Sequence, residues 1–178
     1  MVGGHGQAAS SRVALLWGVL VCVLTLSQSA RSEPISTLDI VHLNYRTAES
    51  TFDPAAEVQL LDLLNRVRQE HGAPRLAMDP SLRSAARAHS QDMATRGYFG
   101  HDTLGGQSFA ERLAGLLRYR MYVGENVALA RSAEQANALF VASPGHFRTM
   151  LESRFHRVGI GIATAGQLGL MVTEDFSD

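Results

Sequence analysis

Lysine is absent from this sequence, and all 16 basic residues are arginine. Without lysine the chain cannot supply a phosphate-loop lysine, a Schiff base or a lysine general base, which excludes the enzyme classes that need one. The 16 basic residues are balanced by 17 acidic ones, and no run of like charge marks a surface for nucleic acid. We therefore expect no nucleic-acid partner.

Cysteine is almost absent as well, because Cys22 is the only one. It lies in an apolar run, Val13–Leu26, that follows a basic residue and precedes small residues up to Ala30. The run has 14 residues, whereas a helix that crosses a bilayer needs about 20. We interpret residues 1–30 as a signal peptide, so the protein should be secreted, periplasmic or extracellular, with membrane contact only through an uncleaved signal segment.

The composition of residues 31–178 divides them into a short N-terminal segment and a folded domain. Residues 31–53 mix serine, threonine, glutamate and proline without a sustained period, which indicates a linker or an N-terminal arm. The folded domain is predicted to span residues 54–178. Its two Asp-Pro pairs each precede apolar residues at helical spacing, which predicts helices over 54–71 and 80–96.

Serine residues start the later predicted helices. Ser108 with Glu111, and Ser132 with Gln135, have the spacing of a capping box, and Ser143 followed by proline opens one more helix. Two strand-like runs joined by a glycine-containing turn then predict a C-terminal hairpin. Helices combined with a small, mainly antiparallel sheet predict an α+β fold in which helices cover the sheet.

Three polar residues stand in apolar or glycine-rich surroundings, namely His101, Glu125 and His146. A buried carboxylate is costly unless it is paired or bound to a cation, so Glu125 needs a partner, and histidines are natural candidates. The alternative is a buried hydrogen-bond network that only fixes loops. The spacing of His101, Glu125 and His146 in the sequence matches no compact zinc motif. The fold would have to bring these three distant segments together to form a metal site.

Two other ionisable residues have simpler explanations. The capping-box position of Glu111 accounts for that residue without any site. His89 lies on the apolar stripe of the second predicted helix, and we expect it to be a hydrogen-bonded core histidine rather than a ligand.

A set of ordered motifs carries a family resemblance over about residues 57–176. The chain resembles a bacterial CAP domain, the fold shared by cysteine-rich secretory proteins, antigen 5 and plant pathogenesis-related 1 proteins. The motifs are Leu64–Gly72, Leu76–Leu82, Ala86–Met93, Phe99-Gly100-His101, Gly124-Glu125-Asn126, Ser143-Pro144-Gly145-His146 and Val158–Gly161.

The resemblance implies a three-layer α-β-α sandwich with a central cleft that holds two histidines and two glutamates. In some relatives this cleft binds zinc or another divalent cation. Carried over residue by residue, His101, Glu125 and His146 occupy the matching positions, and Glu111 is the candidate for the fourth. The disulfides and cysteine-rich extension of eukaryotic relatives have no counterpart in the sequence.

Three functions follow as hypotheses. The favoured one is a secreted, non-enzymatic binding module whose His/Glu cleft takes Zn²⁺ or another divalent cation, with a separate groove for a lipid or sterol. A second is a metal-dependent hydrolase, a peptidase or esterase, with Glu125 or Glu111 as general base. A third is a structural or adhesion module with a cell-envelope or extracellular protein as its partner.

Overall fold

The computed structural model describes residues 40–116 and 122–178. The predicted signal peptide, residues 1–30, lies outside the described residues. None of the helices in the described part is long and apolar enough to cross a membrane.

A four-stranded sheet forms the middle layer of the domain, with the strand order β2-β5-β6-β4. These strands are β2 (Ala77–Met78), β4 (Val123–Ala130), β5 (Arg157–Thr164) and β6 (Leu170–Ser177). The short strand β2 pairs parallel to β5, and the other neighbours are antiparallel. The predicted C-terminal hairpin is therefore β5 and β6, which are joined through the 3₁₀ turn η1 (Gly166–Leu168).

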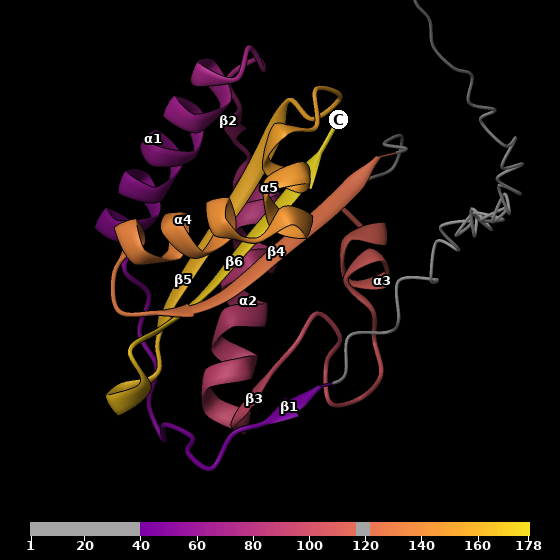
Figure 1. Cartoon of the computed structure of the whole chain (residues 1–178). Coiled ribbons are helices and arrows are strands. Elements are labelled where there is room, and N and C mark those ends of the chain that lie inside the picture. Colours follow the sequence, from indigo (N-terminus) through magenta and orange to yellow (C-terminus); the bar gives the residue numbers. More distant parts are fainter. Residues whose placement is uncertain (1–39, 117–121) are drawn as a thin grey trace, which may run out of the picture. The chain divides into compact units, whose positions relative to one another are not determined.

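Helices cover both faces of this sheet (Figure 1). One face packs on α2 (Pro80–Arg96), and the other on α1 (Pro54–Glu70), α4 (Ala133–Ala142) and α5 (Pro144–Leu151). The short helix α3 (Phe109–Ala114) contacts α2 and β4. The three-layer α-β-α arrangement confirms the predicted fold class.

The helix starts follow from local capping. Asp53 and Asp79 accept backbone N–H bonds at the first turns of α1 and α2, each with a proline at the start, as predicted. Helix α1 ends at Glu70, one residue before the predicted end, with His71 as its C-cap. Ser108 and Glu111 form the predicted capping box of α3. Ser143 precedes α5 but makes no side-chain cap bond.

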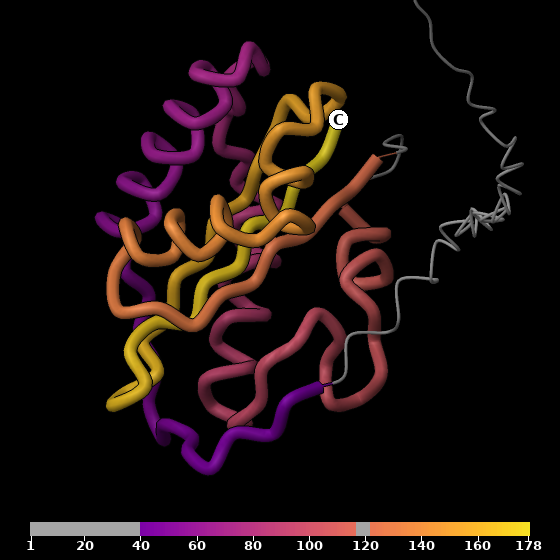
Figure 2. Tube along the Cα trace, viewed as in Figure 1, coloured from indigo at the N-terminus to yellow at the C-terminus, as the bar shows by residue number. Residues whose placement is uncertain are grey.

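Residues 40–52 form an N-terminal arm that lies against the domain (Figure 2). Strand β1 (Val41–His42) pairs with β3 (Tyr98–Phe99), and the Thr47 N–H bonds the Ala94 carbonyl near the end of α2. Farther along, Phe52 bridges Ala163 in β5. The arm therefore covers the end of the domain where α2 stops and β5 turns into β6.

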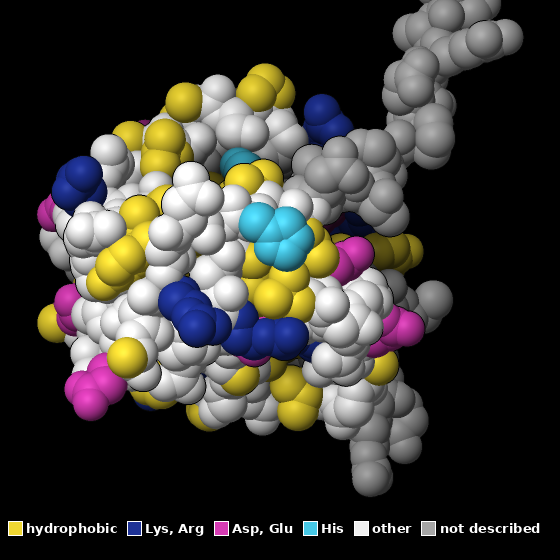
Figure 3. Space-filling view, turned by 90° about the horizontal axis from the view of Figure 1, so that it is seen from below, with side chains coloured by type: hydrophobic (Ala, Val, Ile, Leu, Met, Phe, Trp, Pro, Cys, Tyr) yellow, Lys and Arg dark blue, Asp and Glu magenta, His cyan; other side chains and the backbone are white. Residues whose placement is uncertain are grey.

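Two cores lie on opposite faces of the sheet. The larger one joins α1, α4 and α5 to β5 and β6 through residues such as Leu64, Phe140 and Ile160. The smaller one contains Met93 and Tyr98 beside the end of α2, with Ile40 and Leu43 of the arm packed against it. Figure 3 views the molecule from below, and a short row of basic side chains lies near the middle of that face, with other basic side chains scattered among polar, acidic and hydrophobic ones.

Candidate functional site

His101 and Glu125, both predicted site residues, lie in direct contact. His101 follows β3 in the chain, and Glu125 is in β4. The Nδ1 of His101 is 2.8 Å from Oε1 of Glu125. Because a carboxylate accepts, Nδ1–H is the donor, and this bond fixes the tautomer that leaves the lone pair on Nε2. The exposed fraction of the side chain is 17% for His101 and 0% for Glu125.

Arg112 of α3 joins the same pair. Its guanidinium forms an ion pair with Oε2 of Glu125 and donates a 2.6 Å hydrogen bond to the carbonyl oxygen of His101. Both oxygens of the Glu125 carboxylate therefore have a partner. The Arg112 side chain is 10% exposed, which makes this ion pair a mostly buried one.

Asp175 is the cross-strand neighbour of Glu125 in the β4–β6 register. It is fully buried, and no N–H donor among the described residues contacts either of its carboxyl oxygens. Burial and the nearby Glu125 carboxylate raise the pKa of Asp175 well above its usual value. Asp175 therefore holds its proton more readily than an exposed aspartate does.

Burial and Arg112 act in opposite directions on the Glu125 carboxyl. Burial raises the pKa of Glu125 to about 7, while the charge of Arg112 lowers it. The result is a compact unit of one imidazole, one guanidinium and two carboxyl groups.

His146 lies in the first turn of α5, as predicted. It is half-buried, and its ring packs edge-on against Phe140 with a centroid distance of 5.3 Å. Burial, and then the charge of His101, lower the pKa of His146. Burial and the charge of Arg112 lower the pKa of His101. These lowered pKa values favour the neutral imidazole, the form that a metal ion requires.

Glu111 is not part of this cluster. Its Oε2 is 2.8 Å from the backbone nitrogen of Ser108 and 2.9 Å from that residue's Oγ, and the side chain is exposed. The capping box thus accounts for this carboxylate, and the fourth position implied by the resemblance is not filled by Glu111 in this arrangement.

The donor set decides what kind of cation would fit. Over residues 40–116 and 122–178, no three side chains of His, Cys, Asp or Glu are grouped so that they could hold a metal ion together. The Glu125 oxygens and Nδ1 of His101 are already engaged. Among the predicted ligands, Nε2 of His101 and the ring of His146 are the donors left for a cation, and the described residues do not form a cage of four side chains.

A second buried polar pair lies on the opposite face of β4 and β6. Asn126 donates a 3.1 Å hydrogen bond to Glu174, its cross-strand neighbour, and a weak 3.4 Å bond to the carbonyl of His146. Glu174 is fully buried, and burial raises its pKa to about 8. This pair links the sheet to the start of α5, which carries His146.

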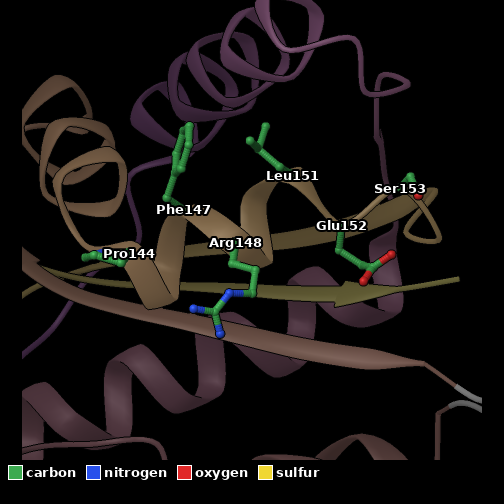
Figure 4. A pocket seen from close by; sticks show the side chains of 6 residues that line it. All are labelled: Pro144, Phe147, Arg148, Leu151, Glu152 and Ser153. Carbon is green, nitrogen blue, oxygen red and sulfur yellow. The ribbon is translucent and has the colours of Figure 1, made fainter. Parts of the chain in front are cut away.

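The structure also shows a groove on α5, separate from the His101–Glu125 contact. It has a volume of about 520 Å³ and is lined by Pro144, Phe147, Arg148, Leu151, Glu152 and Ser153. Phe147 and Leu151 project from the same side of α5, while Arg148 projects from a different side (Figure 4). The groove therefore combines an apolar wall with a charged rim.

His89 behaves as predicted for a core histidine. It is 2% exposed, and its Nε2 is 2.9 Å from the carbonyl oxygen of Gly100. Burial lowers its pKa to about 4, so the ring is neutral at physiological pH. By holding Gly100, His89 supports the residue that precedes His101.

Comparison with known proteins identifies the family. The cysteine-rich secretory protein (CAP) family matches residues 61–176. The chain is 30% identical over 127 residues to the uncharacterized protein YkwD of Bacillus subtilis, a match that covers 70% of this chain and 49% of YkwD. It is also 32% identical over 109 residues to the uncharacterized membrane protein YlbC of the same species, across 60% of this chain and 31% of YlbC. The chain belongs to the CAP family, as the resemblance implied.

Solved structures agree on the fold. An extracellular protein with an SCP domain from Bacillus anthracis superposes with a TM-score of 0.62 at 28% identity, across 69% of this chain and 40% of that one. An outer surface protein from Borrelia burgdorferi gives 0.66 at 13% identity, across 74% and 98% of the two chains. The chain spans about half or less of the length of the curated relatives that it matches.

Sequence reasoning missed Arg112 and Asp175. It also assigned no strand to residues 123–130, although Glu125 was singled out within them. The strand-like run at the C-terminus was recognised, and it contains Asp175. What the sequence did not reveal is that this residue lies opposite Glu125, because register between distant strands leaves no local signal.

Proposed function

We propose that this domain is an exported, non-enzymatic binding module in which His101 and His146 hold a divalent cation such as Zn²⁺. The observation that carries the proposal is the 2.8 Å hydrogen bond from Nδ1 of His101 to Glu125. Metal-binding histidines commonly donate their second ring N–H to a carboxylate, which orients the ring and raises the basicity of the ligand nitrogen. Glu125 would then stand behind His101 rather than contact the cation.

The cation would supply open coordination positions for water or a small ligand, since two imidazoles do not complete a tetrahedral zinc site. Export is supported by the signal-like residues 1–30 and by relatives described as extracellular or outer-surface proteins. The lowered pKa values of His101 and His146 support binding at neutral pH, because protons compete less with a cation for their ring nitrogens.

The hydrolase alternative needs Glu125 or Glu111 as general base. The Glu125 side chain has no exposed surface and both of its oxygens are engaged, while Glu111 is bound in a capping box. A general base must reach the proton that it removes. We therefore place the binding function ahead of hydrolysis.

A titration with Zn²⁺ tests the proposed cation site. Isothermal titration calorimetry at pH 7 on the chain, without a polyhistidine tag, should show stoichiometric binding. His101→Ala and His146→Ala should each weaken binding by more than about 10-fold. His156→Ala, at an exposed position, is the matched control and should bind as the wild type does. Absence of binding by the wild type, with thermal stability lost in the first two variants, would instead support a purely structural network.

The groove on α5 favours a second candidate function, the binding of a lipid acyl chain or a sterol. Its volume lies within the range of small-molecule pockets, about 300–1,000 Å³, and Phe147 and Leu151 give it an apolar wall. Displacement of a fluorescent fatty acid should weaken in Leu151→Gln and persist in His101→Ala. Equal loss in both variants would show that the two sites are not separate. Val58→Gln, at an exposed apolar position on α1, is the control.

A further inference from the structure

Arg148 lies where two hollows on the surface of the domain adjoin. The first is the groove of about 520 Å³ on α5. The second has a volume of about 210 Å³ and lies between α5 and the start of β4, where Tyr122, Thr149 and Phe155 are among its lining residues. Both hollows are lined by Arg148 and Glu152. A ligand that occupied both of them would therefore contact Arg148.

The charge of Arg148 is unmatched at this junction. Arg148 is exposed, and within residues 40–116 and 122–178 no side chain forms an ion pair or hydrogen bond with it. Arg154, in contrast, donates to both carboxylate oxygens of Glu152, at 2.9 and 2.6 Å, and its guanidinium lies 4.1 Å from the centre of the Tyr122 ring. Because Arg154 and Glu152 neutralise each other, the residues that line the two hollows carry one uncompensated positive charge, that of Arg148.

The first hollow places an apolar surface beside this charge. Phe147 and Leu151 form its wall, and Arg148 projects from a different side of the same helix (Figure 4). The Phe147 ring packs edge-on against His71 at the end of α1, with a centroid distance of 5.2 Å, so a second helix supports the wall. An apolar wall next to a single cation is complementary to a molecule that has an alkyl chain and an anionic head group.

We propose that the two hollows bind a single-chain anionic amphiphile, whose alkyl chain contacts Phe147 and Leu151 and whose carboxylate or phosphate head group pairs with Arg148. This inference rests on the lipid-binding candidate function and names the class of its ligand. A guanidinium forms charge-assisted hydrogen bonds with carboxylate and phosphate oxygens, whereas a sterol offers it only a neutral hydroxyl. Arg148 therefore selects an anionic amphiphile over a sterol.

Competition between a charged and an uncharged ligand with the same alkyl chain tests the role of Arg148. Lauric acid and dodecanol would each be used at pH 7 to displace Nile red, a neutral dye, from the protein. Lauric acid should bind about 5-fold more tightly than dodecanol, which is the effect of one exposed ion pair. Arg148→Gln should remove this difference and leave the affinity for dodecanol unchanged. Arg131→Gln, at an exposed arginine, is the matched control.

Two further comparisons separate the head group from the chain. Dodecyl phosphate should show the same dependence on Arg148 as lauric acid, while inorganic phosphate, which has no chain, should not displace the dye. Leu151→Gln should weaken lauric acid and dodecanol to a similar extent, because it changes the apolar wall and leaves the charge in place.

Each result decides the inference. Equal affinities of the wild type for lauric acid and dodecanol overturn it and leave lipid binding in place. A preference for the acid that persists in Arg148→Gln also overturns it, since Arg148 would then only stabilise the last turn of α5. Displacement by inorganic phosphate as strong as that by dodecyl phosphate overturns it in favour of a site for a free anion. If no alkyl ligand binds the wild type, the lipid-binding function fails together with the inference.

Discussion

Buried ionisable residues in this domain differ in how fully they are partnered. Glu57 is completely buried, forms ion pairs with Arg83 and Arg87, and also accepts the N–H of Ile162. Arg68 is equally buried and donates to backbone carbonyl groups in the segment that follows α1, at the end of α5 and in the segment after α5. Glu174 has only the amide of Asn126, and its Oε1 has no hydrogen-bond partner among the described residues. Glu174 is thus neutral at pH 7, in line with its raised pKa.

Glu174→Gln should stabilise the protein increasingly as pH rises from 5 to 8. The pKa of Glu174 is about 8 in the folded chain and about 4.3 for an unperturbed glutamate. Between these values the folded state keeps a proton that the unfolded chain has lost. Wild-type stability therefore falls by about 1.4 kcal/mol per pH unit through this group. Glutamine carries no such proton and removes the slope.

The measurement is the free energy of unfolding in urea, followed by circular dichroism at several pH values. Glu70→Gln, on the exposed end of α1, should run parallel to the wild type and serves as the control. A Glu174→Gln curve that also runs parallel would mean that Glu174 is ionised in the folded protein.

At the scale of elements, two glycines in β5 determine how closely α2 approaches the sheet. A Cβ on Gly159 would lie 2.0 Å from the backbone of Leu82, and one on Gly161 would lie 2.2 Å from the backbone of Ala86. Ser90, one turn farther along α2, bonds the Gly161 carbonyl and the Thr173 hydroxyl. The alternation of glycine with Val158 and Ile160 in the sequence therefore reflects a helix packed directly on one face of the strand.

Gly161→Ala should lower the free energy of unfolding by about 2–3 kcal/mol, because the new methyl group meets helix backbone that cannot rotate away. Gly115→Ala is the control, since no atom of the described residues lies within 4 Å of a Cβ there and its backbone is right-handed helical. Urea denaturation of both variants checks the expectation. Similar stabilities for the two would show that α2 can move away from β5 at little cost.

On the scale of the whole domain, the N-terminal arm, residues 40–52, contacts the segment that precedes His101 in the candidate site. Strand β1 pairs with β3, which directly precedes the Gly100–His101 segment, and Ile40 lies against Gly100. Ile40 and Leu43 also pack on the smaller core. Ile40 and Leu43 thus connect this segment to the loop that carries His101.

A chain that begins at residue 53 should be less stable than one that begins at residue 39. Loss of the apolar contacts of Ile40 and Leu43 should cost about 2 kcal/mol or more. Thermal and urea denaturation of the two chains give the measurement. Amide hydrogen exchange should also rise in the Gly100–His101 segment of the shorter chain. Unchanged exchange there would show that β3 holds this loop without β1.

The sequence by itself determined the features that depend on neighbouring residues. The Asp-Pro starts of α1 and α2, the capping box at Ser108 and Glu111, and the C-terminal hairpin all appear where they were predicted. These structures form from hydrogen bonds and side-chain patterns within a few positions of one another, so the local sequence contains the information.

Only the tertiary structure decided which polar groups meet. Glu125 faces Asp175 because β4 and β6 pair in one register, and Arg112 reaches Glu125 because α3 lies beside β4. Glu111, adjacent to Arg112 in the chain, instead points to solvent and caps its own helix. Strand register and depth of burial arise from contacts between distant segments, and those contacts decide which carboxyl groups lie together and which ring nitrogen of His101 is left without a carboxylate partner.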